Sequence, residues 1–278
     1  MFGKEKIVTT TYQMQIEAME PCKIALVSDL HDHPGDRAAS ILAQEQPDLI
    51  LAAGDIVERC TYGESEYTKD IMNKYQGIVN DGSLRYKLSR TLLRAGEVLH
   101  KKNSVLCGGL PFLEKIAAIA PLYYGLGNHE WYFYPEDRAF FAAHNITLLD
   151  NADVYTDGVR IGGLSTRYDL DWLKAFAKKQ GPKLLICHHP EYYFRHIKGT
   201  EWDTFDLIVS GHVHGGQWRI AGQGVLAPGQ GFFPRYTYGV HEHKLVIGTG
   251  LSNTASVPRW GNPMEVVMIE INHTKTNN

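Results

Sequence analysis

Short apolar runs recur along this chain, and polar residues follow each of them directly. The five runs occupy residues 24–27, 49–53, 121–126, 183–187 and 207–209. Continuous apolar runs of this length are typical of strands that are covered on both faces. Helical patterns lie between or beside them, at residues 36–46, 111–119, 136–144 and 169–180. Strands that alternate with helices predict an α/β sheet.

Two other regions carry strand patterns. Residues 7–16 alternate β-branched with polar side chains, which predicts a half-exposed antiparallel strand. The C-terminal region, residues 218–271, has glycine-rich turns and two β-type runs at 245–247 and 266–269. We expect this C-terminal region to form a second sheet.

The composition is that of an ordinary globular protein. The chain has 278 residues, of which 44% are hydrophobic, so it can bury a sizeable core. Its formal net charge of -3 gives no overall basic field of the kind that nucleic-acid binding requires. We therefore expect no specific nucleic-acid partner.

Cysteine spacing and the apolar content of the termini indicate the compartment. Cys22, Cys60, Cys107 and Cys187 are widely separated and form no Cys-x-x-Cys pair, which predicts reduced thiols. The first residues contain no hydrophobic signal segment, and no run approaches the roughly 18 apolar residues of a membrane span. We therefore expect a cytoplasmic protein.

Residues 61–104 differ in pattern from the rest of the chain. Apolar residues at helical spacing lie on both sides of the turn signal Asn80-Asp81-Gly82, which predicts a helical hairpin inserted into a single domain, 1–278. Its second helix carries six basic residues and one acid. One hypothesis is a cap that contacts an anionic substrate or makes peripheral contact with an anionic membrane. A solvated basic face explains the same charges.

The polar residues that follow the five apolar runs form a candidate metal site. They are Asp29, His31, Asp55, Asn128, His188, His212 and His214. The carboxyl ends of strands in an α/β sheet meet at one crevice, so we expect these side chains to converge. Seven nitrogen or oxygen ligands exceed the needs of one ion, whereas two divalent ions that share a bridging carboxylate use them all. Ligation without thiolate favours manganese, iron or zinc.

These residues stand in five ordered blocks. The blocks are Asp29-x-His31, Gly54-Asp55, Gly127-Asn128-His129-Glu130, His188-x-Pro190 and Gly211-His212-x-His214. In this order they resemble the motifs of the calcineurin-like metallophosphoesterases. The segments at residues 211–217 and 227–234 are similar to a bacterial branch of that family that is often tied to membranes or lipid-linked phosphates.

The resemblance implies a fold and a ligand assignment. The expected fold is a four-layer sandwich of two mixed β-sheets flanked by helices, here with the helical insertion. Asp29, His31 and His214 are expected to hold one metal ion. Asn128, His188 and His212 are expected to hold the other, and Asp55 to bridge the two.

The resemblance also implies a reaction. A hydroxide held between the two ions attacks phosphorus, His129 acts as general acid or hydrogen-bond donor, and Glu130 orients His129 or a metal-ligand imidazole. The expected enzyme is a phosphodiesterase or pyrophosphatase that acts on a nucleotide or lipid-linked substrate. A soluble phosphomonoesterase or protein phosphatase is the alternative, and a non-catalytic binding scaffold is a third reading.

Three nearby residues carry rival interpretations. Strand alternation directs His189 away from His188, which predicts an exposed or substrate-facing side chain. His33, with His31 and Asp36, approaches the metal motif of the metallo-β-lactamase fold, but Arg37 stands where that motif needs histidine, so we expect His33 at the rim. Arg167 is expected to form a surface ion pair or to contact a phosphate.

Overall fold

The structure is a computed structural model that describes residues 6–17, 19–59, 107–130, 133–254 and 258–272. The helical hairpin predicted at residues 61–104 lies outside these ranges, and so does Cys60. Within the described ranges, no helix has both the length and the apolar character needed to cross a membrane.

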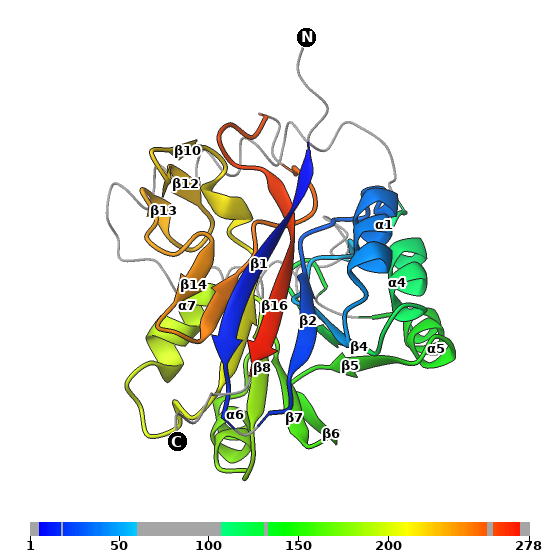
Figure 1. The fold of residues 1–278 in the computed structure, drawn as a ribbon, viewed down its shortest axis with the longest axis vertical. Helices are drawn as coiled ribbons and strands as arrows, with labels where there is room; N and C mark the ends of the chain where they lie inside the picture. Colours follow the sequence, from blue (N-terminus) through cyan, green and yellow to red (C-terminus); the bar gives the residue numbers. More distant parts are fainter. Residues whose placement is uncertain (1–5, 18, 60–106, 131–132, 255–257, 273–278) are drawn as a thin grey trace, which may run out of the picture.

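Two six-stranded mixed sheets form the centre of the fold (Figure 1). The first has the order β1 (Ile7–Gln15), β16 (Met264–Asn272), β2 (Cys22–Val27), β3 (Leu49–Ala52), β4 (Leu122–Gly125), β5 (Ile146–Leu149). The second has the order β14 (Gly239–His241), β15 (Leu245–Ile247), β9 (Leu207–Ser210), β8 (Lys183–Cys187), β7 (Val159–Leu164), β6 (Ala152–Thr156). Strands β2 to β5 run parallel, and so do β7, β8, β9 and β15.

Three hydrophobic clusters separate four layers. The first sheet packs its outer face on α1 (Asp36–Glu45), α4 (Gly109–Ala117) and α5 (Pro135–Ala143). The second sheet packs on α6 (Leu170–Ala177), α7 (Pro190–Tyr192) and η2 (Tyr193–Ile197). The middle cluster draws its strand residues from both sheets and contains no residue of these helices. The predicted four-layer α/β sandwich is therefore confirmed.

Each central strand contributes side chains to two of these clusters, as its apolar run predicts. In β2, Ile24 and Leu26 point between the sheets, whereas Ala25 and Val27 point to the helices. Successive side chains on a strand face opposite sides, so burial on both faces requires an uninterrupted apolar run.

Two expectations about the sheets are wrong. Strand β1 has the predicted half-exposed pattern, but it pairs in parallel with β16 rather than antiparallel. The C-terminal region does not form one sheet, because β15 joins the second sheet and β16 returns to the first, between β1 and β2. Eight of the nine residues of β16 are at least half-buried, and this burial requires an interior position in a sheet. Residue alternation shows which face is buried but not the direction of the partner strand.

Small elements complete the second half of the chain. They are η3 (His214–Gly216), β10 (Arg219–Ile220), β11 (Gln223–Gly224), β12 (Leu226–Ala227) and β13 (Gly231–Phe232). Strands β10 and β11 form one two-stranded sheet and β12 and β13 form another. Both lie close to η3, so this region packs beside the loop that follows β9.

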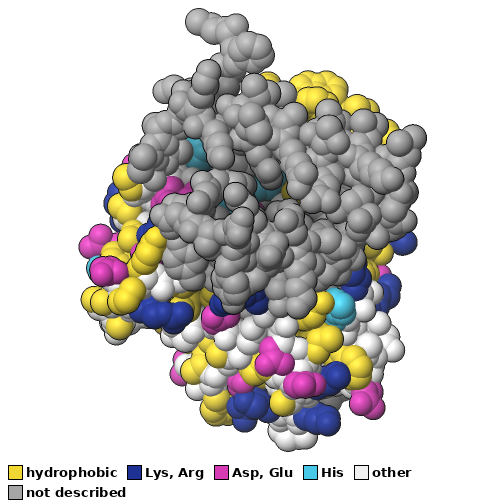
Figure 2. All heavy atoms as spheres, turned by 180° about the vertical axis from the view of Figure 1, so that it is seen from behind, with side chains coloured by type: hydrophobic (Ala, Val, Ile, Leu, Met, Phe, Trp, Pro, Cys, Tyr) yellow, Lys and Arg dark blue, Asp and Glu magenta, His cyan; other side chains and the backbone are white. Residues whose placement is uncertain are grey.

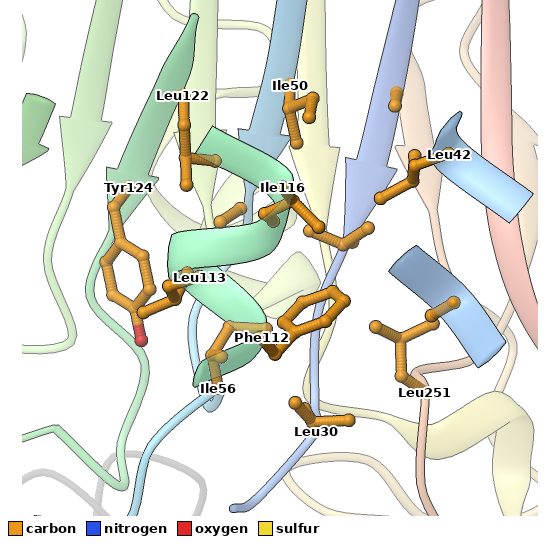
Figure 3. Packing of buried hydrophobic residues seen from close by; sticks show 14 of the residues in the cluster. Leu30, Leu42, Ile50, Ile56, Phe112, Leu113, Ile116, Leu122, Tyr124 and Leu251 are labelled. Carbon is orange, nitrogen blue, oxygen red and sulfur yellow. The ribbon is translucent and has the colours of Figure 1, made fainter. Parts of the chain in front are cut away.

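Core side chains anchor the loops that follow β2 and β3. Leu30, between Asp29 and His31, and Ile56, next to Asp55, are both buried in the cluster that includes Phe112 of α4. Figure 3 shows Leu30 and Ile56 directed toward Phe112. Packing of this kind fixes the backbone from which the polar side chains project.

Candidate metal centre

All seven predicted ligand residues lie just beyond the carboxyl ends of parallel strands. Asp29 and His31 follow β2, Asp55 follows β3, and Asn128 follows β4. His188 follows β8, and His212 and His214 follow β9. Five of the seven have a positive φ: Asp29 (54°), His31 (51°), Asp55 (55°), His212 (69°) and His214 (46°). Such backbone is uncommon outside glycine, and clusters of it mark functional sites.

One group of ligand atoms belongs to Asp29, His31 and His214. Their ligand atoms all lie within 4.8 Å of one another. The Asp29 Oδ1 atom is 3.6 Å from His214 Nε2 and 4.0 Å from His31 Nε2. Asp29 is fully buried, and its carboxylate accepts hydrogen bonds from the His212 backbone N–H at 3.0 and 3.1 Å. The structure thus brings together the three residues assigned to one metal ion.

A second group centres on His188. Its Nε2 atom is 3.1 Å from Asp55 Oδ2 and 3.2 Å from Asn128 Oδ1. His188 also forms a group with His189 and His212 whose ligand atoms lie within 4.8 Å of one another. His188 therefore lies beside both Asn128 and His212, and His189 joins the two imidazoles.

Asp55 lies between the two groups. Its Oδ2 atom is 3.9 Å from His31 Nε2 and 3.1 Å from His188 Nε2. It is 4.0 Å from His129 Nε2, and Oδ1 accepts the His129 backbone N–H at 2.8 Å. One carboxylate is thus shared by both groups, the position of a bridging ligand.

The donor set fits divalent metal ions. His31 Nδ1 is 2.6 Å from Glu58 Oε1, and His188 Nδ1 is 2.6 Å from the Ala53 carbonyl oxygen. These contacts direct the Nε2 atoms of both rings toward Asp55. The Nε2 atom of His31 is buried and makes no hydrogen bond among the described residues. A buried nitrogen without a hydrogen bond, facing two buried carboxylates, is what a cation site provides.

A protein-family model matches the part of the chain that contains all seven predicted ligand residues. Residues 22–216 match the model of the calcineurin-like phosphoesterases. The chain belongs to the calcineurin-like phosphoesterase family. Members of this family are metal-dependent phosphoric ester hydrolases that use two divalent metal ions.

Three curated relatives of this chain come from two bacterial genera. It is 28% identical to an uncharacterized metallophosphoesterase of Helicobacter pylori strain 26695 over 178 residues, 60% of this chain and 44% of that protein. It is 29% identical to an uncharacterized metallophosphoesterase of Helicobacter pylori strain J99 over 154 residues, 51% of this chain and 38% of that protein. It is 23% identical to the uncharacterized metallophosphoesterase Cj0846 of Campylobacter jejuni over 264 residues, 91% of this chain and 58% of that protein. The matched part thus spans about half the length of these relatives.

Among solved structures, this chain is similar to TT1561 of Thermus thermophilus. The two share 14% identity with a TM-score of 0.39, and the match covers 69% of this chain and 82% of that chain.

Glu58 is a site residue that sequence reasoning missed. Its Oε2 atom lies 2.8 Å from His129 Nδ1, and its Oε1 atom holds His31 Nδ1. The carboxylate therefore orients a ligand imidazole and the candidate general acid of the phosphoesterase together. The sequence offered one indication of this role, because Glu58 is an acid only three residues after Asp55 in the same loop.

Neighbouring charged groups determine the protonation of His129, His188 and Asp55. Burial alone lowers the pKa of His129, but Glu58 and Asp55 raise it to about 10. Burial alone also lowers the pKa of His188, and Asp55 raises it to about 9. Burial raises the pKa of Asp55, yet His188 and His129 hold it well below its usual range. The Asp55 carboxylate is therefore ionised.

Glu130 does not orient an imidazole. Its buried carboxylate accepts the backbone N–H groups of Asp55 at 2.8 Å, Ile56 at 2.7 Å, Val57 at 3.1 Å and Gly127 at 2.8 Å. It also accepts the Tyr124 hydroxyl. Glu130 thus fastens the loop after β3 to the loop after β4, and it acts on the site through the backbone of Asp55.

His189 is buried, not exposed. Its Nε2 atom lies 3.0 Å from Thr166 Oγ1, and its ring contacts the ring of His212 with centroids 4.2 Å apart. The alternation argument fails because β8 ends at Cys187, so the backbone of His188 and His189 is no longer a strand. Burial holds the pKa values of His189, His212 and His214 well below the usual value. These three imidazoles are neutral, the form that binds a metal ion.

The loop that carries His214 is fastened by residues from the end of the chain. Asn262 donates to the His214 carbonyl at 2.7 Å, and Arg259 Nη2 lies 3.0 Å from His214 Nδ1. A Cβ atom at Gly215 would lie 2.1 Å from Asn262 Oδ1, and φ there is +63°. Glycine is therefore required at this position.

Arg167 forms an ion pair with Asp150 at 3.5 Å, the first of its two predicted roles.

Proposed function

We propose that this chain hydrolyses phosphodiester or phosphoanhydride bonds with two divalent metal ions, on a nucleotide or lipid-linked substrate. The observation that carries the proposal is the place of Asp55 between two ligand groups. When bound, the two ions supply Lewis acidity toward phosphoryl oxygens and lower the pKa of a coordinated water. Manganese, iron or zinc suits imidazole, carboxylate and amide donors.

His129 is the proposed proton donor to the leaving oxygen. Glu58 holds its Nδ1 atom, so the Nε2–H group is directed toward Asp55, 4.0 Å away. A positioned imidazolium can donate to a nearby oxygen that develops negative charge. Its backbone N–H, bound to Asp55, fixes the ring close to the shared carboxylate.

An exposed apolar surface supports a substrate with a base or an acyl chain. It comprises Trp218, Ile220, Phe233 and Trp260, which we term the aromatic patch; their exposed fractions range from 40% to 66%. Trp218 and Trp260 form a backbone bridge, and Trp218 lies four residues beyond His214. Exposed aromatic groups beside a metal centre suit an apolar or planar substituent on the phosphate. A small phosphomonoester has no apolar group that could contact these side chains.

The charge pattern on the face shown in Figure 2 supports the proposal of a small-molecule or lipid-linked substrate. Figure 2 shows basic and acidic side chains interspersed on the described part of that face. Nucleic-acid binding needs a continuous basic surface. Peripheral contact of residues 61–104 with an anionic membrane stays a proposal that rests on their charge alone.

Hydrolysis of bis-p-nitrophenyl phosphate and p-nitrophenyl phosphate, side by side, tests the proposed reaction. We expect preference for the diester with manganese added, and loss of activity with chelator. Preference for the monoester would favour the phosphomonoesterase alternative. Stable binding of two metal ions without hydrolysis of either compound, or of any nucleotide or lipid diphosphate, would favour the binding scaffold.

The double variant Trp218→Ala, Trp260→Ala tests the substrate class. Methyl and decyl p-nitrophenyl phosphodiesters are compared. We expect KM for the decyl compound to rise about 10-fold, since roughly 1.4 kcal/mol of apolar contact is lost, while kinetics with the methyl compound stay unchanged. Tyr155→Ala removes an equally exposed aromatic side chain from β6 and serves as the control. An equal effect on both compounds would contradict the role of the patch.

A further inference from the structure

Three of the four imidazoles predicted as metal ligands have one ring nitrogen held at hydrogen-bond distance. The partners are Glu58 for His31, the Ala53 carbonyl for His188 and Arg259 for His214. In the part of the chain that the structure describes, neither ring nitrogen of His212 has such a partner. Its Nε2 atom instead faces the Glu191 carboxylate, with Oε1 at 3.8 Å. His212 is therefore the imidazole whose orientation needs an explanation.

Glu191 is a buried carboxylate beside two imidazoles. It lies in α7, is 8% exposed, and its Oε1 atom is 3.5 Å from His189 Nδ1. Its Oε2 atom makes no hydrogen bond among the described residues, and neither does His189 Nδ1. A buried carboxylate without a donor is costly, so this position is compatible with folding only if a positive or proton-donating partner is close. His212 and His189 are the groups at hand.

The turn between β12 and β13 keeps Glu191 in this position. A Cβ atom at Gly229 would lie 2.2 Å from Glu191 Oε1, and φ at Gly229 is +71°. Gln230 closes the turn, because its Nε2 atom donates to the Tyr236 carbonyl at 2.7 Å and its Oε1 atom accepts the Tyr236 N–H at 3.1 Å. The segment at residues 227–234 thus shapes a place for one carboxylate.

We propose that Glu191 is a positioning residue for His212. By accepting the Nε2–H of His212, it leaves Nδ1 as the unprotonated nitrogen that is available to the second metal ion. Carboxylates that accept from a ligand imidazole fix its tautomer and raise its basicity. The inference rests on the proposed function, because it takes His212 as a metal ligand.

This arrangement reverses the one seen at the other rings. His31 and His188 have Nδ1 held and Nε2 directed to Asp55. His212 has Nε2 directed to Glu191. The reversal makes a specific expectation: in the metal-loaded protein, His212 carries its proton on Nε2.

Metal titration of Glu191→Gln tests the proposal without any substrate. The chelator-treated protein is titrated with manganese in a calorimeter, and bound metal is counted by elemental analysis. We expect one of two binding events to weaken about 10- to 100-fold and the other to stay unchanged. Glu191→Asp should recover part of the loss. Glu201→Gln, an exposed acid ten residues away, should match the wild type.

Two further measurements separate positioning from a structural effect. Long-range ¹H–¹⁵N spectra of the zinc-loaded wild type should show His212 protonated on Nε2, and Gly229→Ala should weaken the same binding event as Glu191→Gln. Protonation on Nδ1, or unchanged affinity in Glu191→Gln, would overturn the proposal. A wild type that binds two metals and hydrolyses no phosphoester would refute the proposed function and leave this inference standing.

Discussion

The two sheets supply two chemically different halves of one site. The half from the loops after β2, β3 and β4 contains the carboxylates Asp29, Asp55, Glu58 and Glu130, which accept many short hydrogen bonds. The half from the loops after β8 and β9 contains four imidazoles, and among the described residues only the ring of His212 has no hydrogen-bond partner. The first half is preorganised by protein contacts, whereas the second half consists mainly of neutral nitrogen donors.

The difference shows how the fold prepares a cation site. Against the effect of burial, Glu58 and Asp55 raise the pKa of His129 to about 10, so negative charge in the first half is partly balanced by a proton. Asp55 likewise raises the pKa of His188, the imidazole of the second half beside the shared carboxylate, to about 9. Burial keeps His212 and His214 neutral in the second half. A divalent ion between the halves receives charge from one side and neutral ligands from the other.

Removal of the shared carboxylate should have the largest effect. Asp55→Asn keeps the shape of the side chain but halves its ligand capacity, so both halves lose their common ligand. We expect turnover to fall on the order of 10³-fold or more, with loss of at least the second metal. Steady-state kinetics and elemental analysis on the same sample measure both. Two tightly bound ions in this variant would contradict the bridging role.

Glu130→Gln should destabilise the first half. Four backbone N–H groups donate to the Glu130 carboxylate in the wild type. The glutamine side chain replaces one of the two acceptor oxygens by an NH₂ group, which cannot accept these hydrogen bonds. We expect a loss of about 3 kcal/mol in the free energy of unfolding, measured with urea. Tyr124→Phe removes a single hydrogen bond to the same carboxylate and should cost about 1 kcal/mol. Equal costs in the two variants would show that the backbone contacts contribute little.

His129→Ala should slow the chemical step while both metals stay bound. The ring donates a proton in the proposed mechanism but belongs to neither assigned ligand set. We expect kcat to fall about 100-fold, with unchanged metal content. A lost metal ion would instead identify His129 as a ligand, which its group with His31 and Asp55 allows.

Glu58→Gln should change the pH dependence more than the maximal rate. Glu58 helps to raise the pKa of His129 to about 10, so its neutralisation lowers that pKa toward the ordinary value. The protonated ring is then lost at lower pH, and the basic limb of kcat/KM moves down in pH. We expect about a 10-fold loss at pH 8.5 and little at pH 6. Glu114→Gln, which removes an exposed ion pair with His144, should leave the profile unchanged.

The strand pattern predicted which loops converge, because uninterrupted apolar runs mark strands buried between layers. The polar residues after β2, β3, β4, β8 and β9 do lie together. The pattern did not predict that β16 enters the first sheet, because β pairing across about 240 residues leaves no local signal.

Contacts between side chains were the part that sequence could not supply. Glu58, Glu191 and Arg259 each contact a histidine of a different loop. The positions of these three residues in the chain do not reveal which histidine each contacts. His189 shows the same limit: strand alternation no longer applied once β8 had ended. The resemblance assigned Glu130 to an imidazole, whereas its buried carboxylate is surrounded by backbone donors.

A crystal structure of the manganese-loaded protein, with anomalous diffraction, tests the central claim most directly. The account predicts two anomalous peaks, each within ligand distance of an Asp55 oxygen, one beside Asp29, His31 and His214 and the other beside Asn128, His188 and His212. A single peak, or two peaks of which neither contacts Asp55, would contradict it.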